Sequence, residues 1–202
     1  MRTGKSRISA VILLCVAAML WFLVEPAIAD EVTDTIKTAL TEYKNGEYAS
    51  AAENLDYAQQ QIRQKKGDKL KSFLPEALEG WTADDSSFQT IGSIMLGGGI
   101  IAERQYSKEA SLVNVKIVAD APMLRGVMMM FTNPMFITAG GGELEQVKGQ
   151  KAIIKYTPER ETGEINVVVA DRILVTVAGD SVKKQALIDY AESIDYRKLA
   201  KI

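Results

Sequence analysis

The hydrophobic positions of residues 31–65 recur at spacings of three and four, which is the pattern of amphipathic helices. Asn45-Gly46 interrupts this pattern, and glycine readily adopts the left-handed conformation that ends a helix. The segment therefore predicts two antiparallel helices joined by a short turn. The apolar positions are Val32, Ile36, Leu40 and Tyr43 in the first helix and Tyr48, Ala51, Leu55, Ala58 and Ile62 in the second.

After a charged junction at residues 67–75, the pattern changes to short runs rich in β-branched residues, which are typical of strands. Alternation is clearest where Val113, Val115 and Ile117 share one face, and it favours a sheet with one solvated face. The runs that predict strands are 88–95, 100–106, 112–118, 143–148, 152–156, 165–170 and 173–177. The predicted turns are residues 97–99, 107–110, 149–150, 161–163 and 171–172.

Two more helices are predicted within this second region. Residues 123–131 show no alternation, and Asn133-Pro134 is expected to stop the helix that they form. Ser181 is expected to cap a final helix. Its apolar face comprises Ala186, Leu187, Tyr190, Ala191 and Ile194. The predicted fold class is α+β, with an N-terminal helical hairpin followed by a mainly antiparallel sheet with two packed helices.

Six residues of the hairpin fall where a tetratricopeptide repeat places its aromatic, glycine, alanine and bulky apolar positions. They are Tyr43, Gly46, Tyr48, Ala51, Leu55 and Ala58. The hairpin therefore resembles one such repeat, and a single copy leaves one of its faces without a neighbouring repeat. Either this face packs on the following domain, or Tyr43, Tyr48 and Leu55 form a face for a partner protein or a second copy.

The order of three strands, a helix, four strands and a helix follows Leu74-Pro75 and Gly80-Trp81. This arrangement is similar to the Mog1 and PsbP-like α/β/α sandwich. The resemblance implies a fold only, and no functional residue is carried over from it.

The first 29 residues have the pattern of an export signal. Arg2, Lys5 and Arg7 precede an apolar run at residues 8–24, and Ala27-Ile28-Ala29 has small residues where signal peptidase requires them. The run is long for a signal peptide and short for a membrane span, which leaves an uncleaved inner-membrane anchor facing the periplasm as the alternative. The expected organisation is a signal peptide at 1–29, the hairpin at 30–66 and an α+β sandwich domain at 70–202, in the periplasm.

Composition narrows the chemistry of the exported part. The 202 residues include no histidine and one cysteine, Cys15, which would leave with the signal. Disulfides, thiol nucleophiles, imidazole bases and the commonest zinc ligands are then excluded from the mature chain. The formal net charge is −2, and loss of the basic leader makes it more negative. Nucleic acid is therefore not an expected partner, and a membrane is one only if the signal is uncleaved.

A methionine cluster at residues 123–135 is the least ordinary local feature. Thioethers are soft ligands suited to Cu(I), but consecutive residues 128–130 point about 100° apart on a helix. The pattern therefore favours a core helix or an apolar groove over a metal site, and no cofactor is expected. The candidate groove residues are Met123, Met128, Met129, Met130, Phe131 and Met135.

The sequence contains no recognisable catalytic constellation, because its carboxylates border predicted turns and no nucleophile elbow occurs. It predicts a non-enzymatic periplasmic binding or scaffolding module for another envelope protein or for itself. The alternative is a carrier or sensor of a small apolar ligand, held between the sheet and the methionine-rich helix. Methionines packed inward would favour the first function, and methionines lining an open cavity the second.

Overall fold

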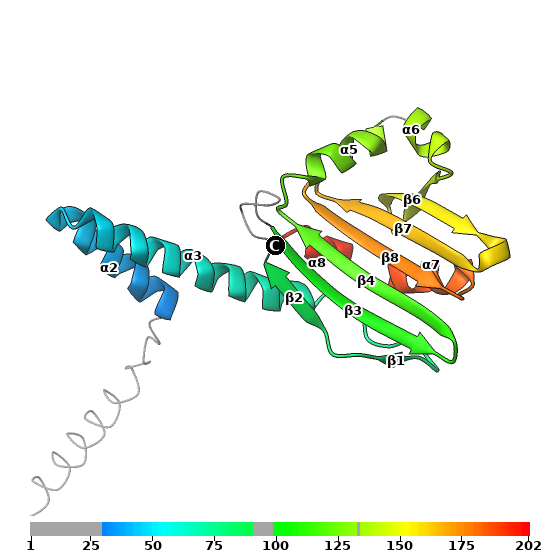
Figure 1. The fold of residues 1–202 in the computed structure, drawn as a ribbon, viewed down its shortest axis with the longest axis horizontal. Coiled ribbons are helices and arrows are strands. Elements are labelled where there is room, and N and C mark those ends of the chain that lie inside the picture. The colour runs from blue at the N-terminus through cyan, green and yellow to red at the C-terminus, as the bar shows by residue number, and fades with distance from the viewer. Residues whose placement is uncertain (1–29, 91–98, 133) are drawn as a thin grey trace, which may run out of the picture. The chain divides into compact units, whose positions relative to one another are not determined.

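The computed structural model describes residues 30–90, 99–132 and 134–202 (Figure 1). The predicted export signal lies outside this description, as does most of the strand predicted at residues 88–95. The chain divides into two compact units, residues 1–58 and 59–202. The dividing point falls inside a helix, whereas the sequence placed a boundary between residues 66 and 70.

The first unit holds the predicted helical hairpin. Helix α2 (Glu31–Asn45) ends at Gly46, whose φ of 84° is left-handed and whose N–H donates to the carbonyls of Glu42 and Tyr43. Helix α3 (Tyr48–Lys71) begins two residues later. The turn thus uses the glycine as predicted, because a left-handed residue closes the last turn of a helix with little strain only when it lacks a Cβ.

The two helices pack through small side chains. Val32 and Ala39 of α2 are buried, as are Ala51 and Ala58 of α3. Alanines at this seam let the two backbones approach closely, and the side-chain amide of Asn54 donates to Glu42 Oε2 across it at 2.8 Å. We refer to these four buried residues as the hairpin seam.

Helix α3 continues well past Lys65, where the sequence pattern placed its end. Gly67 looked like part of a junction, but it lies within the helix and receives the ring of Phe88. A Cβ at Gly67 would lie only 2.3 Å from a ring carbon of Phe88. One turn further on, Leu70 is completely buried in the main core. The glycine is therefore a close-packing position, and burial of the next turn outweighs its low helix propensity.

In the described part of the second unit, eight strands form one antiparallel sheet with the order β1-β3-β4-β8-β7-β6-β5, and β2 also pairs with β3. The strands are β1 (Thr82–Ala83), β2 (Ser87–Thr90), β3 (Ile100–Lys108), β4 (Ser111–Ala119), β5 (Glu143–Val147), β6 (Gln150–Thr157), β7 (Thr162–Val169) and β8 (Ile173–Asp180). The predicted alternation in β4 is confirmed, since Val113, Val115 and Ile117 are fully buried. The two-residue β1 was not predicted.

The turn predicted at residues 161–163 is wrong. Thr162 and Gly163 belong to β7 and pair with Thr157 and Tyr156 of β6. The chain instead reverses through a 3₁₀ turn at Pro158–Arg160 and a left-handed Glu161. Proline fixes φ at the value that such a turn requires, whereas the Gly163 site leaves no room for a Cβ beside the Tyr156 ring.

Helices pack on both faces of the sheet, and one of these faces stays partly solvated along β4. Helix α7 (Lys184–Ser193) and the unpredicted α8 (Tyr196–Leu199) contribute Leu187, Tyr190 and Leu199 to the main core on one face. Helix α5 (Leu124–Thr132) and the unpredicted α6 (Pro134–Ala139) lie together on the other face (Figure 1). Helix α5 ends at Thr132, close to the predicted stop, and proline is well suited to the first turn of α6.

Ser181 does not cap the final helix, contrary to the prediction. Helix α7 begins at Lys184, and the capping position is Lys183, without a side-chain hydrogen bond. Ser181 has a left-handed φ of 53° and turns the chain from β8 toward α7. Its carbonyl accepts a hydrogen bond from the Ser111 hydroxyl at 2.5 Å. The residue therefore fixes a loop between strand and helix rather than the start of the helix.

Candidate functional site

Helices α5 and α6, which we call the cover, form a second small core on the sheet face opposite α7 and α8, which we call the outer face. Residues at spacings of three and four turn one side of α5 toward β6, β7 and β8. We call this set the outer cluster. It consists of buried Phe131, Ile137, Ile153 and Val168, with Val127, Met128 and Leu174 packed at its edge.

A cleft of about 290 Å³ opens beside the outer cluster. Val127, Phe131 and Ile137 line it from the helices, while Ile153 and Leu174 line it from the sheet. The remaining lining residues are polar and come from strands: Lys155, Glu164, Asn166 and Thr176. The cleft therefore has an apolar end beneath the helices and a polar end along the open sheet.

Strand register places the polar residues side by side. Ile153 pairs with Asn166, which pairs with Thr176, and Lys155 pairs with Glu164 in the next row on the same face. These residues were not singled out from the sequence. Their alternation with buried neighbours is visible there, but their proximity depends on the register of three strands.

Hydrogen bonds fix most of the polar end. The Thr176 hydroxyl donates to Asn166 Oδ1 at 2.7 Å, and the Asn166 amide nitrogen donates to Glu164 Oε1. The ammonium group of Lys155 makes no ion pair or hydrogen bond with any side chain in residues 30–90, 99–132 and 134–202. Lys155 is half-buried and lines the cleft, and Glu164 accepts a hydrogen bond from Asn166. The cleft thus offers one uncommitted cation.

Most of the residues predicted to form a methionine groove do not line this cleft. Met123, Met129 and Met135 are 49 %, 69 % and 75 % exposed. Met128 is half-buried against the outer cluster, and the side chain of Met130 lies outside the description. Of the six candidate residues, Phe131 lines the cleft. The described methionines therefore form the exposed side and edge of the cover.

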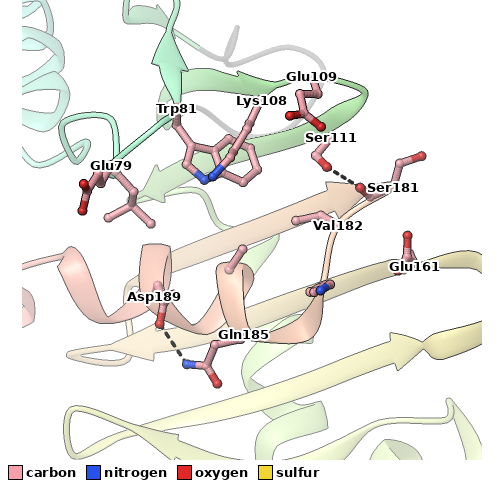
Figure 2. Close-up of a pocket in the computed structure, with 13 residues that line it drawn as sticks. Glu79, Trp81, Lys108, Glu109, Ser111, Glu161, Ser181, Val182, Gln185 and Asp189 are labelled. Carbon is pink, nitrogen blue, oxygen red and sulfur yellow. Dashed lines mark hydrogen bonds between the residues drawn. The ribbon is translucent and has the colours of Figure 1, made fainter.

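A second depression, of about 700 Å³, lies at the end of the sheet where β8 leads into α7 (Figure 2). Three loop residues on its rim, Glu109, Glu161 and Ser181, have left-handed φ angles. Charged side chains of both signs surround it, all of them exposed: Glu79, Lys108, Glu109, Glu161, Lys183 and Asp189. Figure 2 shows Gln185 and Asp189 joined by a hydrogen bond of 2.8 Å along α7. Because these exposed side chains carry charges of both signs, the depression does not favour a ligand of one particular charge.

Three aromatic side chains pack together next to this depression, and one of them, Trp81, lines it. The half-buried Trp81 stands edge-on to Tyr190 with ring centroids 5.4 Å apart, and Tyr106 lies 4.5 Å from Tyr190. The Tyr106 hydroxyl donates to the Pro75 carbonyl at 2.6 Å. Burial raises the pKa of Tyr106, although Arg104 nearby acts to lower it. The raised pKa keeps the phenol protonated, so that it can donate this hydrogen bond. These rings are structural supports of the core.

An ion cluster anchors α3 and the C-terminus within the second unit. Asp120 pairs with Lys66, and its other oxygen lies 3.2 Å from Arg172 Nη1. Burial would raise the pKa of Asp120, but the two cations together lower it below its ordinary value. Arg172 also donates to the carbonyl of Ile202 at 2.7 Å. All the charges are satisfied locally, so this cluster has a structural role.

A third surface lies on the hairpin of the first unit. Ile36, Leu40, Tyr43, Tyr48 and Leu55 are between 42 % and 66 % exposed. Successive residues of a helix are about 100° apart around its axis. Counted in this way, each of the five side chains is displaced around its own helix from the seam residues of that helix, in the same sense and by up to about 90°. Because α2 and α3 are antiparallel, the same sense of displacement places the residues of α2 and those of α3 on one side of the hairpin. We call these five residues the hairpin face.

The predicted partner face belongs to this surface. Tyr43, Tyr48 and Leu55 are among its most exposed members, and the rings of the two tyrosines meet at 5.6 Å with an angle of 60°. The seam beneath is closed by Val32, Ala39, Ala51 and Ala58, so more than half of the surface of each of these large side chains remains exposed.

Comparison with known proteins yields no match: no family model, curated sequence or solved structure corresponds to this chain. Among the described residues, no helix is both long and apolar enough to cross a membrane. The same residues contain no group of three or more aspartate, glutamate, cysteine or histidine side chains placed to hold a metal ion.

Proposed function

We propose that the protein is an exported, non-enzymatic binding module that holds another envelope protein through the hairpin face. The observation that carries this proposal is the exposure of five large apolar side chains on one side of the hairpin. Monomeric proteins rarely leave such a contiguous patch in water without a use for it. The resemblance to a tetratricopeptide repeat and the export pattern of residues 1–29 support the same function.

The composition of the hairpin face suits protein recognition. Tyrosines are enriched at protein interfaces because one ring buries a large apolar area while its hydroxyl remains hydrated. Leu40 and Leu55 are 53 % and 54 % exposed, so completing the burial of either contributes about half of the roughly 1.5–3 kcal/mol that full burial of such a side chain provides. A partner helix laid across the hairpin would meet apolar side chains from both α2 and α3.

A photo-crosslinking amino acid placed at Leu40 tests the proposal in the cells that make the protein. We expect a crosslinked product of one defined mass, because a specific partner would occupy the hairpin face. The same product should be strongly reduced when Tyr48→Ser and Leu55→Ser are added. Gel mobility and mass spectrometry of the product identify its second component.

The matched control carries the crosslinker at Glu53, which is exposed on α3 but turned away from the hairpin face. No product is expected from that position. A crosslinked dimer of this chain would indicate that a second copy is the partner. Equal products from Leu40 and Glu53, or none from Leu40, would contradict the proposed function.

Export is tested by the mass of the protein recovered from the envelope fraction of its bacterial host. We expect a chain that starts at Asp30, because Ala27-Ile28-Ala29 provides the small residues that precede a cleavage site. A recovered chain that still begins at Met1 and sediments with membranes would instead establish the anchored alternative.

A further inference from the structure

We propose that the cleft beneath α5 and α6 binds a small amphiphile with one carboxylate head and an unbranched apolar tail. This site is separate from the hairpin face and does not depend on the proposed function. It revises the ligand-carrier hypothesis of the sequence, because strand residues and the inner side of α5 line the cleft, rather than the exposed methionines.

The apolar end of the cleft defines the tail. Val127, Phe131 and Ile137 face Ile153 and Leu174 across it, and none of these five side chains can pair with a polar group. Its volume of about 290 Å³ is just below the range for small-molecule sites, roughly 300–1,000 Å³. A chain of medium length therefore fits better than a phospholipid with two long chains.

The polar end defines the head. The Thr176 hydroxyl donates to Asn166 Oδ1, and the Asn166 amide donates to Glu164, so these three groups form one hydrogen-bonded chain in which Glu164 keeps its negative charge. Lys155 has no such partner among the described side chains. A half-buried ammonium gains most from an anion that replaces the water it loses on ligand binding. A carboxylate at Lys155 places the attached tail beside Ile153, two residues along the same face of β6.

The cover is suited to admitting such a ligand. Helix α6 has only six residues, and Met128 packs at the edge of the outer cluster. Met128 does not line the cleft, but its unbranched thioether readily changes rotamer, so the packing around Val127 and Phe131 can adjust to a bound tail at little cost.

Decanoate is the probe for this site. We titrate it below its micelle concentration into the mature chain by calorimetry and record amide NMR spectra in parallel. The expected result is one site per chain, with shifts concentrated at Val127, Ile153, Asn166 and Leu174. Decanol should bind about tenfold more weakly, because it lacks the charge-assisted hydrogen bond to Lys155.

The variant Lys155→Gln distinguishes the contact between the carboxylate head and Lys155 from apolar binding of the tail. We expect decanoate affinity to fall about tenfold while decanol affinity is unchanged. The matched control is Lys151→Gln, which removes an exposed lysine from the same face of β6 outside the cleft and should leave both affinities unaltered.

Three outcomes would overturn the proposal. The first is equal loss of decanoate affinity in the two lysine variants, which would indicate attraction by net charge alone. The second is tighter binding of decyltrimethylammonium than of decanoate, which would assign the polar end to Glu164. The third is an absence of shifts at the cleft residues at saturating decanoate. Because neither variant alters a buried apolar side chain, circular dichroism should confirm that both remain folded.

Discussion

Tyr190→Ala is expected to lower the free energy of unfolding by about 3–5 kcal/mol, which is the usual cost of deleting a large buried aromatic ring. Tyr190 is completely buried, and its ring contacts both Trp81 and Tyr106. Its removal would leave a cavity between α7 and the sheet that rigid neighbouring rings cannot fill. Urea denaturation, followed by tryptophan fluorescence and far-ultraviolet circular dichroism, measures the loss.

Tyr190→Phe is the matched control, because it keeps the ring and removes only the hydroxyl. That oxygen accepts one long hydrogen bond, 3.4 Å, from the Leu78 N–H. We expect a cost below about 1 kcal/mol, since a long bond of this kind contributes less than an average one. A similar loss in both variants would show that the hydroxyl, rather than the packed ring, stabilises this part of the core.

Ala51→Trp is expected to separate α2 from α3 at a cost of roughly 1–3 kcal/mol or more, because an indole cannot fit into a seam filled by small residues. Ala51 is 3 % exposed and lies in this seam with Ala58, Ala39 and Val32. Hydrogen exchange of the α2 amides is the most direct measurement, since it reports local opening of the hairpin.

Ala52→Trp provides the control at the adjacent position. Ala52 is exposed on the same helix, so the same indole should be accommodated within about 0.5 kcal/mol. If the two variants give equal exchange rates in α2, the helices do not pack through Ala51.

The sequence predicts the fold class well because its strongest signals are local. The position of Gly46 follows from one glycine between two helical patterns, and the buried face of β4 follows from alternation over seven residues. The errors arise where tertiary contacts decide local structure. Helix α3 continues through Gly67 because the next turn buries Leu70, and Gly163 belongs to a strand because it pairs with Tyr156 of β6; Phe88 at the first site and Tyr156 and Leu187 at the second leave no space for a Cβ. No local pattern reveals either contact.

The candidate sites differ in the same way. The hairpin face can be predicted because Tyr43, Tyr48 and Leu55 lie on two helices joined by a short turn. The cleft combines Val127, Lys155 and Thr176, which are far apart in the sequence and meet through helix placement and strand register. The methionines drew attention as a rare residue type, whereas ordinary lysine and asparagine residues on a solvated sheet face did not.

Strand β5 has a consequence for how the protein behaves at high concentration. It is the last strand in the sheet order and therefore has one edge without a partner strand among the described residues. Exposed edges can recruit strands from other molecules and begin aggregation. Here Glu143 and Glu145 both lie within 4 Å of Lys184, which places charged groups along a strand of only five residues. A second chain would have to dehydrate or displace them, so the edge resists growth into a fibril.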